Sequence, residues 1–159
     1  VVLSQIHEID YLMDLFGVPE NVVAFGGQLS HLEVDVEDVV DVLLTQRLGD
    51  RILPSTLHMD YAQRPSSRFC RIVGDEGTVR MDITNTLVTL DRAGGERAVF
   101  EFPSFERNHL FEREVAHFFE CVSEQQPTQV PVEVGAASLR TALAIKRSLA
   151  NGAVERVPG

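Results

Sequence analysis

Residues 39–102 constrain the fold most, because they form a run of extended segments separated by tight-turn signals. Val40, Val42 and Leu44 fall on one face, and Asp41, Thr45 and Arg47 tend to the other, which is the period of two that is typical of a half-buried strand. Glycine-containing turns with no helical repeat between the segments predict antiparallel pairing. The expected strands are residues 39–48, 52–64, 68–73, 78–83, 87–90 and 98–102, with a short strand before them at 22–25.

Three segments outside this run have helical periodicity. The first, Ser4 to Gly17, opens with a residue type that caps helices and closes with one that ends them. The others are expected at 108–125 and 134–149, and in the last one Leu139, Ala142, Leu143 and Leu149 are expected to face inward. One helix, about six antiparallel strands and two further helices predict an α+β fold, with an open, mostly antiparallel sheet and helices packed on one face.

The charge balance excludes several classes of partner. The chain has 24 acidic and 14 basic residues among 159, a formal net charge of −10, which disfavours nucleic acid and anionic membrane surfaces. No apolar run approaches the roughly 20 residues of a membrane span, and no signal-peptide pattern opens the chain. Cys70 and Cys121 fall in an expected strand and an expected helix, so we expect two buried, reduced thiols and a cytoplasmic protein.

No motif in the sequence indicates a metal or a nucleotide site. His7-Glu8 lacks the second histidine of a zinc helix, since Tyr11 stands at that position. The acidic stretch 28–38 lacks the turn glycine of a calcium loop and suits a surface connection or an edge strand. The glycine pairs match neither a dinucleotide fingerprint nor a phosphate loop, so we expect this chain alone to bind no cofactor.

Two polar clusters could carry chemistry. On the first helix His7, Asp10 and Tyr11 share one face, and a neutral imidazole near pH 7 can give or take a proton. The alternative is that His7 is a structural helix-start residue. The second cluster is the run 58–64, where Gln63 and Arg64 suit the hydroxyl or anionic groups of a sugar-like ligand, and the alternative there is cross-strand pairing on a solvated sheet face.

The ordered set of these segments resembles the second domain of the Gfo/Idh/MocA oxidoreductases, the family of glucose–fructose oxidoreductase and inositol dehydrogenase. The resemblance covers nearly the whole chain. The segments that carry it are Val1–Gly17, His58–Pro65 with Arg68, Arg71–Val79, Phe111–Phe119 and Ala136–Ala144.

The resemblance implies a role for each part of the chain. It implies a dihydrodipicolinate-reductase-like C-terminal fold, with residues 1–159 as a single domain that follows an absent Rossmann domain binding NAD or NADP. It makes His7 the proton relay during hydride transfer, and Tyr11, Gln63 and Arg64 candidate contacts to a sugar-type substrate. It also implies a homo-oligomer, most simply a dimer, formed through the open sheet face.

One position departs from the family pattern. Many members carry an acidic residue four positions before the histidine, where this chain has Leu3, which favours a nucleotide sugar or other sugar derivative over inositol or a simple polyol. The chain also opens at Val1 and enters a helix almost at once, so we expect it to be part of a longer protein. The rival hypothesis is a non-catalytic module whose open sheet pairs with a copy of itself.

Overall fold

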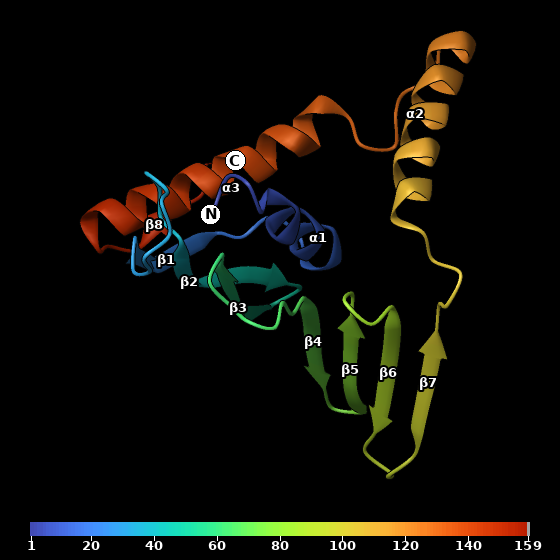
Figure 1. The fold of residues 1–159 in the computed structure, drawn as a ribbon, viewed down its shortest axis with the longest axis horizontal. Helices are drawn as coiled ribbons and strands as arrows, with labels where there is room; N and C mark the ends of the chain where they lie inside the picture. The colour runs from blue at the N-terminus through green and yellow to red at the C-terminus, as the bar shows by residue number, and fades with distance from the viewer. Residues whose placement is uncertain (159) are drawn as a thin grey trace. The chain divides into compact units, whose positions relative to one another are not determined.

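The computed structural model describes residues 1–158 and contains three helices and eight strands among them (Figure 1). Their bounds in chain order are α1 Ile6–Phe16, β1 Asn21–Gly27, β2 Val39–Leu48, β3 Arg51–Asp60, β4 Phe69–Gly74, β5 Gly77–Asp82, β6 Leu87–Arg92, β7 Arg97–Glu101, α2 Arg107–Glu124, α3 Val132–Asn151 and β8 Glu155–Arg156. The chain divides into two compact units. The first comprises Val1–Ala62 and the chain from Gln129 onward, and the second comprises Gln63–Thr128.

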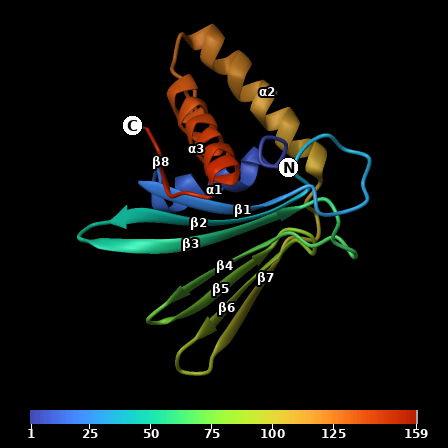
Figure 2. The ribbon, with the colours of Figure 1, turned by 90° about the vertical axis from the view of Figure 1, so that its left-hand side faces the viewer.

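The first unit is a two-layer structure. Its four-stranded antiparallel sheet has the order β3-β2-β1-β8, and α1 and α3 lie on the same side of it (Figure 2). The alternation expected along the second strand is confirmed, because Val40, Val42 and Leu44 are all buried. Leu57 and Met59 continue that apolar face on β3, so the core lies between the sheet and the two helices.

Helix α3 packs through small side chains. Ala142, Ala144 and Ile145 are fully buried, as are the hydroxyl residues Thr141 and Ser148, so the helix lies close to β1 and α1. Of the residues expected to face inward, Ala142 is buried and Leu149 packs partly against the core, but the expectation is wrong for the other two. Leu139 and Leu143 are 45% and 43% exposed, because the buried face of α3 is formed instead by Ala137, Thr141, Ala144, Ile145 and Ser148.

Helix α1 ends at the expected residue but begins differently from the expectation. Gly17 ends the helix with a φ of 84°, a conformation that costs glycine little, and its N–H donates to the carbonyl of Met13. At the other end the cap residue is Gln5, and no side chain caps the helix. The expected capping residue, Ser4, instead donates its hydroxyl proton to the carbonyl oxygen of Val1 at 3.0 Å.

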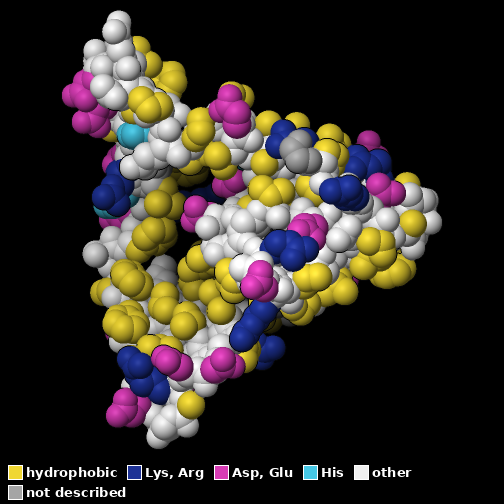
Figure 3. Space-filling model, turned by 180° about the vertical axis from the view of Figure 1, so that it is seen from behind, with side chains coloured by type: hydrophobic (Ala, Val, Ile, Leu, Met, Phe, Trp, Pro, Cys, Tyr) yellow, Lys and Arg dark blue, Asp and Glu magenta, His cyan; other side chains and the backbone are white. Residues whose placement is uncertain are grey.

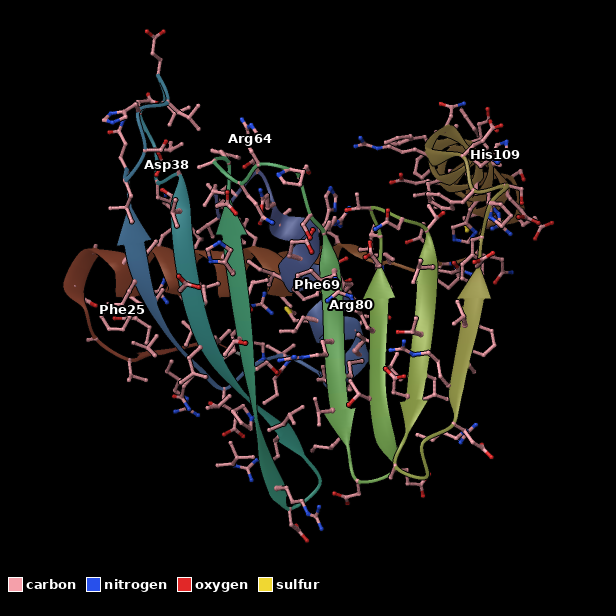
Figure 4. All side chains as sticks on the ribbon, turned by 60° about the horizontal axis from the view of Figure 1, so that its bottom comes forward. Phe25, Asp38, Arg64, Phe69, Arg80 and His109 are labelled. Carbon is pink, nitrogen blue, oxygen red and sulfur yellow. The ribbon has the colours of Figure 1, made fainter. Side chains whose placement is uncertain are left out.

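The second unit has a single-layer sheet of order β4-β5-β6-β7, joined by hairpins, followed by α2. The register places eight apolar residues on one of its faces, and Figure 3 shows hydrophobic side chains gathered over this sheet at the lower left. These residues are Cys70, Ile72, Val79, Met81, Val88, Leu90, Ala98 and Phe100. The other face is mixed: there the Arg80 guanidinium lies 4.1 Å from the centre of the Phe69 ring. Figure 4 labels the two residues on the neighbouring strands β4 and β5.

The α+β class and its antiparallel strands are confirmed, while the arrangement differs in detail. Eight strands form two four-stranded sheets, whereas the sequence pattern predicts about six strands in one sheet. The acidic stretch 28–38 is a connection and contains no strand. The two cysteines form no disulfide; Cys121 is buried as expected, whereas Cys70 is only half-buried. Among the described residues no helix combines the length and the apolar character that a bilayer crossing requires.

Candidate functional site

The polar face of α1 presents His7 to solvent. His7 is exposed and Tyr11, one turn later, is half-buried, while Ile9 on the opposite side is fully buried in the core. This division follows from the amphipathic spacing, because the apolar stripe must face the sheet and therefore turns the imidazole outward. His7 and Tyr11 are residues i and i+4 of this helix, so they lie on the same face as expected.

Asp10, on the same helix, is engaged with α3. The hydroxyl of Ser138 donates to Oδ1 of Asp10 at 2.6 Å, and Ser138 is 3% exposed. Asp10 shares the helix face of His7, but this carboxylate oxygen accepts a hydrogen bond from the neighbouring helix. Asp10 therefore fixes α1 to α3 one turn beyond the imidazole.

The residues just before His7 contact the end of β3. Nε2 of Gln5 donates to the carbonyl oxygen of Asp60 at 3.0 Å, and the hydroxyls of Ser4 and Tyr61 are hydrogen-bonded to each other. Val2, which is fully buried, donates its backbone N–H to Oε1 of Glu37 at 3.2 Å. The approach to the helix is thus tied to the sheet by side chains as well as by packing.

The end of β3 is itself held in place. The backbone N–H of Tyr61 donates to the carbonyl of Asp38, and the N–H of Ala62 donates to Oδ1 of Asp60 at 2.7 Å. Asp38 directly precedes β2, at the end of the sheet where β1 finishes, as Figure 4 shows. Its carboxylate accepts hydrogen bonds from the hydroxyl and the N–H of Ser30. The hydroxyl of Ser30 is the largest cause that lowers the pKa of Asp38, so this carboxylate stays ionised and holds the loop.

His58 makes the contacts of the structural alternative for the run 58–64, which is cross-strand pairing on the sheet face. It pairs across the strands with Asp41, Nδ1 lying 2.8 Å from Oδ1, and its Nε2 lies 3.2 Å from Oδ2 of Asp60. The hydrogen bond to Asp41 is the main cause that raises the pKa of His58 above its usual value. An imidazole with a carboxylate at each nitrogen is suited to carry both protons, and His58 holds this arrangement on the open face of the sheet.

Gln63 and Arg64 lie in the connection after β3, and both are exposed. The guanidinium of Arg64, labelled in Figure 4, donates from Nη1 to the carbonyl of Gln63 at 2.8 Å. These two residues belong to the second unit, whereas His7 and Tyr11 belong to the first. Their common use in one substrate site stays a prediction.

The described residues do not fit a metal or a dinucleotide. No group of three or more histidine, cysteine or acidic side chains among residues 1–158 is arranged to hold a metal ion. Every strand pairing in the described chain is antiparallel, whereas a pyrophosphate site needs a parallel strand, a glycine turn and a helix N-terminus. No step of a reaction is therefore assigned to a cofactor held by these residues.

Sequence reasoning missed the residues that support His7. Gln5 and Ser138 each make a side-chain hydrogen bond to a segment far away in the sequence, to Asp60 and to Asp10 respectively. Tyr61 was part of a polar cluster, but its pairing with Ser4 joins positions 57 residues apart. A weak signal existed at Gln5, because glutamine is an unusual residue at the start of a helix whose neighbour is serine.

Comparison with known families gives a match over residues 1–158 to the profile of the oxidoreductase family, C-terminal alpha/beta domain, of the Gfo/Idh/MocA group. No curated protein matches the chain. Solved structures do, and the chain spans about half the length of each. The first is an oxidoreductase from Agrobacterium radiobacter in complex with NAD+, L-tartaric acid and magnesium, with 18% identity, a TM-score of 0.74, and coverage of 96% of this chain and 47% of that one.

Two further solved structures carry sugar nucleotides in their names. The UDP-N-acetylglucosamine 3-dehydrogenase GnnA from Acidithiobacillus ferrooxidans has 19% identity and a TM-score of 0.73, over 91% of this chain and 45% of that one. The WlbA dehydrogenase from Bordetella pertussis, in complex with NADH and UDP-GlcNAcA, has 23% identity and a TM-score of 0.70, over 98% and 44%. At these identities the likeness establishes the fold alone.

Proposed function

Because this chain belongs to the Gfo/Idh/MocA oxidoreductase family and spans its C-terminal α/β domain, we propose that it is the substrate-binding and oligomerisation domain of an NAD(P)-dependent oxidoreductase. The substrate is a sugar or sugar derivative that is oxidised at a hydroxyl-bearing carbon. The hydride chemistry belongs to a dinucleotide bound outside residues 1–158, so these residues alone are expected to be inactive.

The observation that carries the proposal is the placement of His7. It is the exposed polar residue in the first turn of a helix whose other face is buried in the core. The resemblance to the family matches it with the proton-relay histidine, and we propose that role for it. An imidazole accepts the proton that a substrate hydroxyl releases on oxidation, and returns it in the reverse reaction. Tyr11, Gln63 and Arg64 supply hydroxyl, amide and guanidinium groups that suit a polyhydroxylated and anionic ligand.

The names of two similar structures support the substrate class. One acts on UDP-N-acetylglucosamine by its name, and another was solved with UDP-GlcNAcA. Leu3, which stands where many members have an acidic residue, points the same way and against a simple polyol. A cytoplasmic location fits such a reaction and a chain whose two cysteines form no disulfide.

The test uses the full-length product of the gene, assayed with NAD+ and NADP+ against a panel of UDP-sugars, aldoses and polyols. His7→Asn is expected to lower kcat by roughly 100- to 10,000-fold, the usual contribution of a general acid–base group. His31→Asn is the matched control, because His31 is also an exposed histidine of the first unit and lies in the loop after β1. Full turnover by His7→Asn would overturn the catalytic assignment.

A second candidate function, self-association through the open sheet, is favoured by a different observation. The face of the first unit's sheet that points away from α1 and α3 carries Phe25, Leu43 and Ile52, which are 66%, 43% and 59% exposed. Figure 4 shows Phe25 projecting from β1. A sheet with apolar residues on both faces is typical of one that is buried on both sides in an oligomer.

Sedimentation of the purified protein tests this candidate. Leu43→Lys is expected to convert a dimer to a monomer, because a charge in an apolar sheet interface has no partner. Leu143→Lys is the control, since Leu143 is equally exposed at 43% but lies on α3, on the other side of the sheet. A monomeric parent protein, or equal dissociation by both variants, would contradict self-association through the sheet.

A further inference from the structure

The first turn of α1 needs support from outside the helix. Its cap residue, Gln5, makes no side-chain bond to the exposed N–H groups of the helix, and the ends of uncapped helices fray. His7 lies in this turn, two residues after the cap. An imidazole on a frayed turn samples many positions, whereas proton transfer requires it within hydrogen-bond reach of one oxygen.

Two side chains supply that support from the same point of the sheet. Gln5 donates to the carbonyl oxygen of Asp60 at 3.0 Å, and Ser4 is hydrogen-bonded to the hydroxyl of Tyr61, the next residue along the chain. Adjacent residues before the helix therefore contact adjacent residues at the end of β3. Two bonds of this kind fix both the position of the helix start and its rotation.

The direction of the hydroxyl bond follows from counting protons. Ser4 has one hydroxyl proton, which it donates to the carbonyl of Val1 at 3.0 Å. Its oxygen therefore accepts the proton of Tyr61, and the phenol is the donor of the pair. A phenylalanine at position 61 keeps the ring, which packs partly against the core, and loses this donation.

The end of β3, to which Ser4 and Gln5 bind, is itself held by contacts outside α1. Tyr61 donates its backbone N–H to Asp38, whose carboxylate is bound by the loop that follows β1. On the far side of His7, the bond from Ser138 fixes Asp10 to α3 at 2.6 Å. Side-chain hydrogen bonds therefore hold the chain on both sides of His7, at Ser4 and Gln5 before it and at Asp10 after it.

We propose that Ser4, Gln5 and Tyr61 are positioning residues, which hold the first turn of α1 to the end of β3 and thereby keep His7 in the orientation needed for proton transfer. This inference rests on the proposed function, because it assigns the three residues a task only if His7 carries the proton. They act through His7, and no contact to the substrate is assigned to them.

Kinetics of the full-length protein test the proposal. The double variant Gln5→Met with Tyr61→Phe keeps both side-chain volumes and removes both donors. We expect kcat to fall about tenfold with KM changed less than about twofold, because a small misplacement of a reacting group costs rate more than binding. Ser4→Ala should also lower kcat. Ser4→Thr, which keeps a hydroxyl, should have a kcat close to that of the parent protein.

The matched control is Gln28→Met. Gln28 also donates from Nε2 to a backbone carbonyl, that of Val34 at 2.6 Å, and it lies in the first unit away from α1. Its variant should retain the parental kcat. The second readout needs no turnover: in the NMR spectrum of the chain, the His7 ring signals should be single and sharp in the parent and in Gln28→Met, and shifted or broadened in the double variant.

The outcomes separate this inference from the function on which it rests. A loss of turnover in His7→Asn together with parental kcat and unchanged His7 signals in the double variant overturns the positioning role and leaves the function standing. Unimpaired turnover in His7→Asn overturns both. A lower kcat with unchanged KM, disturbed His7 signals and recovery in Ser4→Thr supports the inference.

Discussion

The two units of this chain differ in where their apolar residues lie. In the first unit they form one buried core between the sheet and two helices, from Ile9 on α1 to Ile145 on α3, both fully buried. In the second unit Cys121 is the only buried residue among those described. There the apolar stripe of α2 is exposed, with Phe111, Phe118 and Val122 each more than half accessible.

This difference indicates different local stabilities. A sheet gains most of its stability when one face is buried against another layer, and the second unit has one sheet layer with an amphipathic helix whose apolar side is open. Units with few buried contacts open at lower free energy than the core of the same chain. We therefore expect the first unit to unfold last, and matched substitutions in the two units to have unequal effects.

The largest contrast is expected for large apolar side chains. Ile145→Ala removes a fully buried side chain from the first unit and should lower the free energy of unfolding by about 3 kcal/mol, through lost transfer energy and a residual cavity. Phe118→Ala in α2, where the ring is 54% exposed, should cost less than about 0.5 kcal/mol. Urea unfolding followed by circular dichroism measures both. Equal losses would mean that α2 is buried in the protein in solution.

Two glycines allow a closer comparison of the units, because a Cβ added to either one would meet a backbone carbonyl oxygen of the paired strand. A Cβ at Gly26 would lie 2.2 Å from the carbonyl oxygen of Val39, and one at Gly77 would lie 2.3 Å from that of Asp91. Either alanine forces two paired strands apart and should cost about 2 kcal/mol locally. Gly77→Ala should open the second unit alone, and Gly26→Ala should destabilise the first.

The chain contains a built-in probe for this experiment. It has no Trp and two Tyr, Tyr11 and Tyr61, and both belong to the first unit. Tyrosine fluorescence therefore reports the first unit, and far-ultraviolet circular dichroism reports both. In Gly77→Ala the two urea transitions should separate, with the fluorescence midpoint unchanged. Coincident transitions would show that the units unfold together.

Buried and exposed serines give a smaller contrast. The hydroxyl of Ser148 accepts from the N–H of Ala24 at 2.9 Å and donates to the carbonyl of Ala153 at 2.6 Å, and the residue is fully buried. Ser148→Ala leaves both partners unpaired and should cost about 2 kcal/mol. Ser123 on α2 donates only to the carbonyl of Glu120 at an exposed site, so Ser123→Ala should be nearly neutral. Thermal unfolding of the two variants tests the difference.

The sequence predicted these elements well where local periodicity decides the structure. The strand at residues 39–48 and the end of α1 at Gly17 were expected from alternation and from a helix-stopping glycine, and both are confirmed. The two-residue strand β8 was not expected, because two residues carry no period and pair only through their register with Asn21 and Val22. The division into two sheets depends on long-range pairing, which local patterns do not encode.

The candidate site was predictable only in part, for the same reason. The polar face with His7 follows from helical spacing, and the structure presents it to solvent. The hydrogen bonds that fix that face join Gln5 to Asp60 and Ser138 to Asp10, pairs that are 55 and 128 positions apart. A single sequence gives no information on such pairs, because tertiary packing brings them together.

The smallest expected effect concerns pH and the open face of the first unit. The pKa of His58 is raised above its model-peptide value of about 6.5, mainly by the hydrogen bond to Asp41. The stabilisation is therefore complete below about pH 6.5 and is lost as the pH rises through the elevated pKa in the folded protein. His58 is 51% exposed at its side chain, so solvent screening limits the contribution to about 0.5 kcal/mol.

Urea unfolding followed by tyrosine fluorescence, and repeated between about pH 6 and pH 8, isolates this contribution to the first unit. The parent protein should lose slightly more stability than His58→Gln across that range, because glutamine keeps a hydrogen-bonding group and carries no titrating charge. Since Asp41 and Asp60 face the imidazole from the same sheet, removing either carboxylate should reduce the pH dependence. An identical pH dependence in the parent and His58→Gln would show that His58 is not protonated between its two carboxylates.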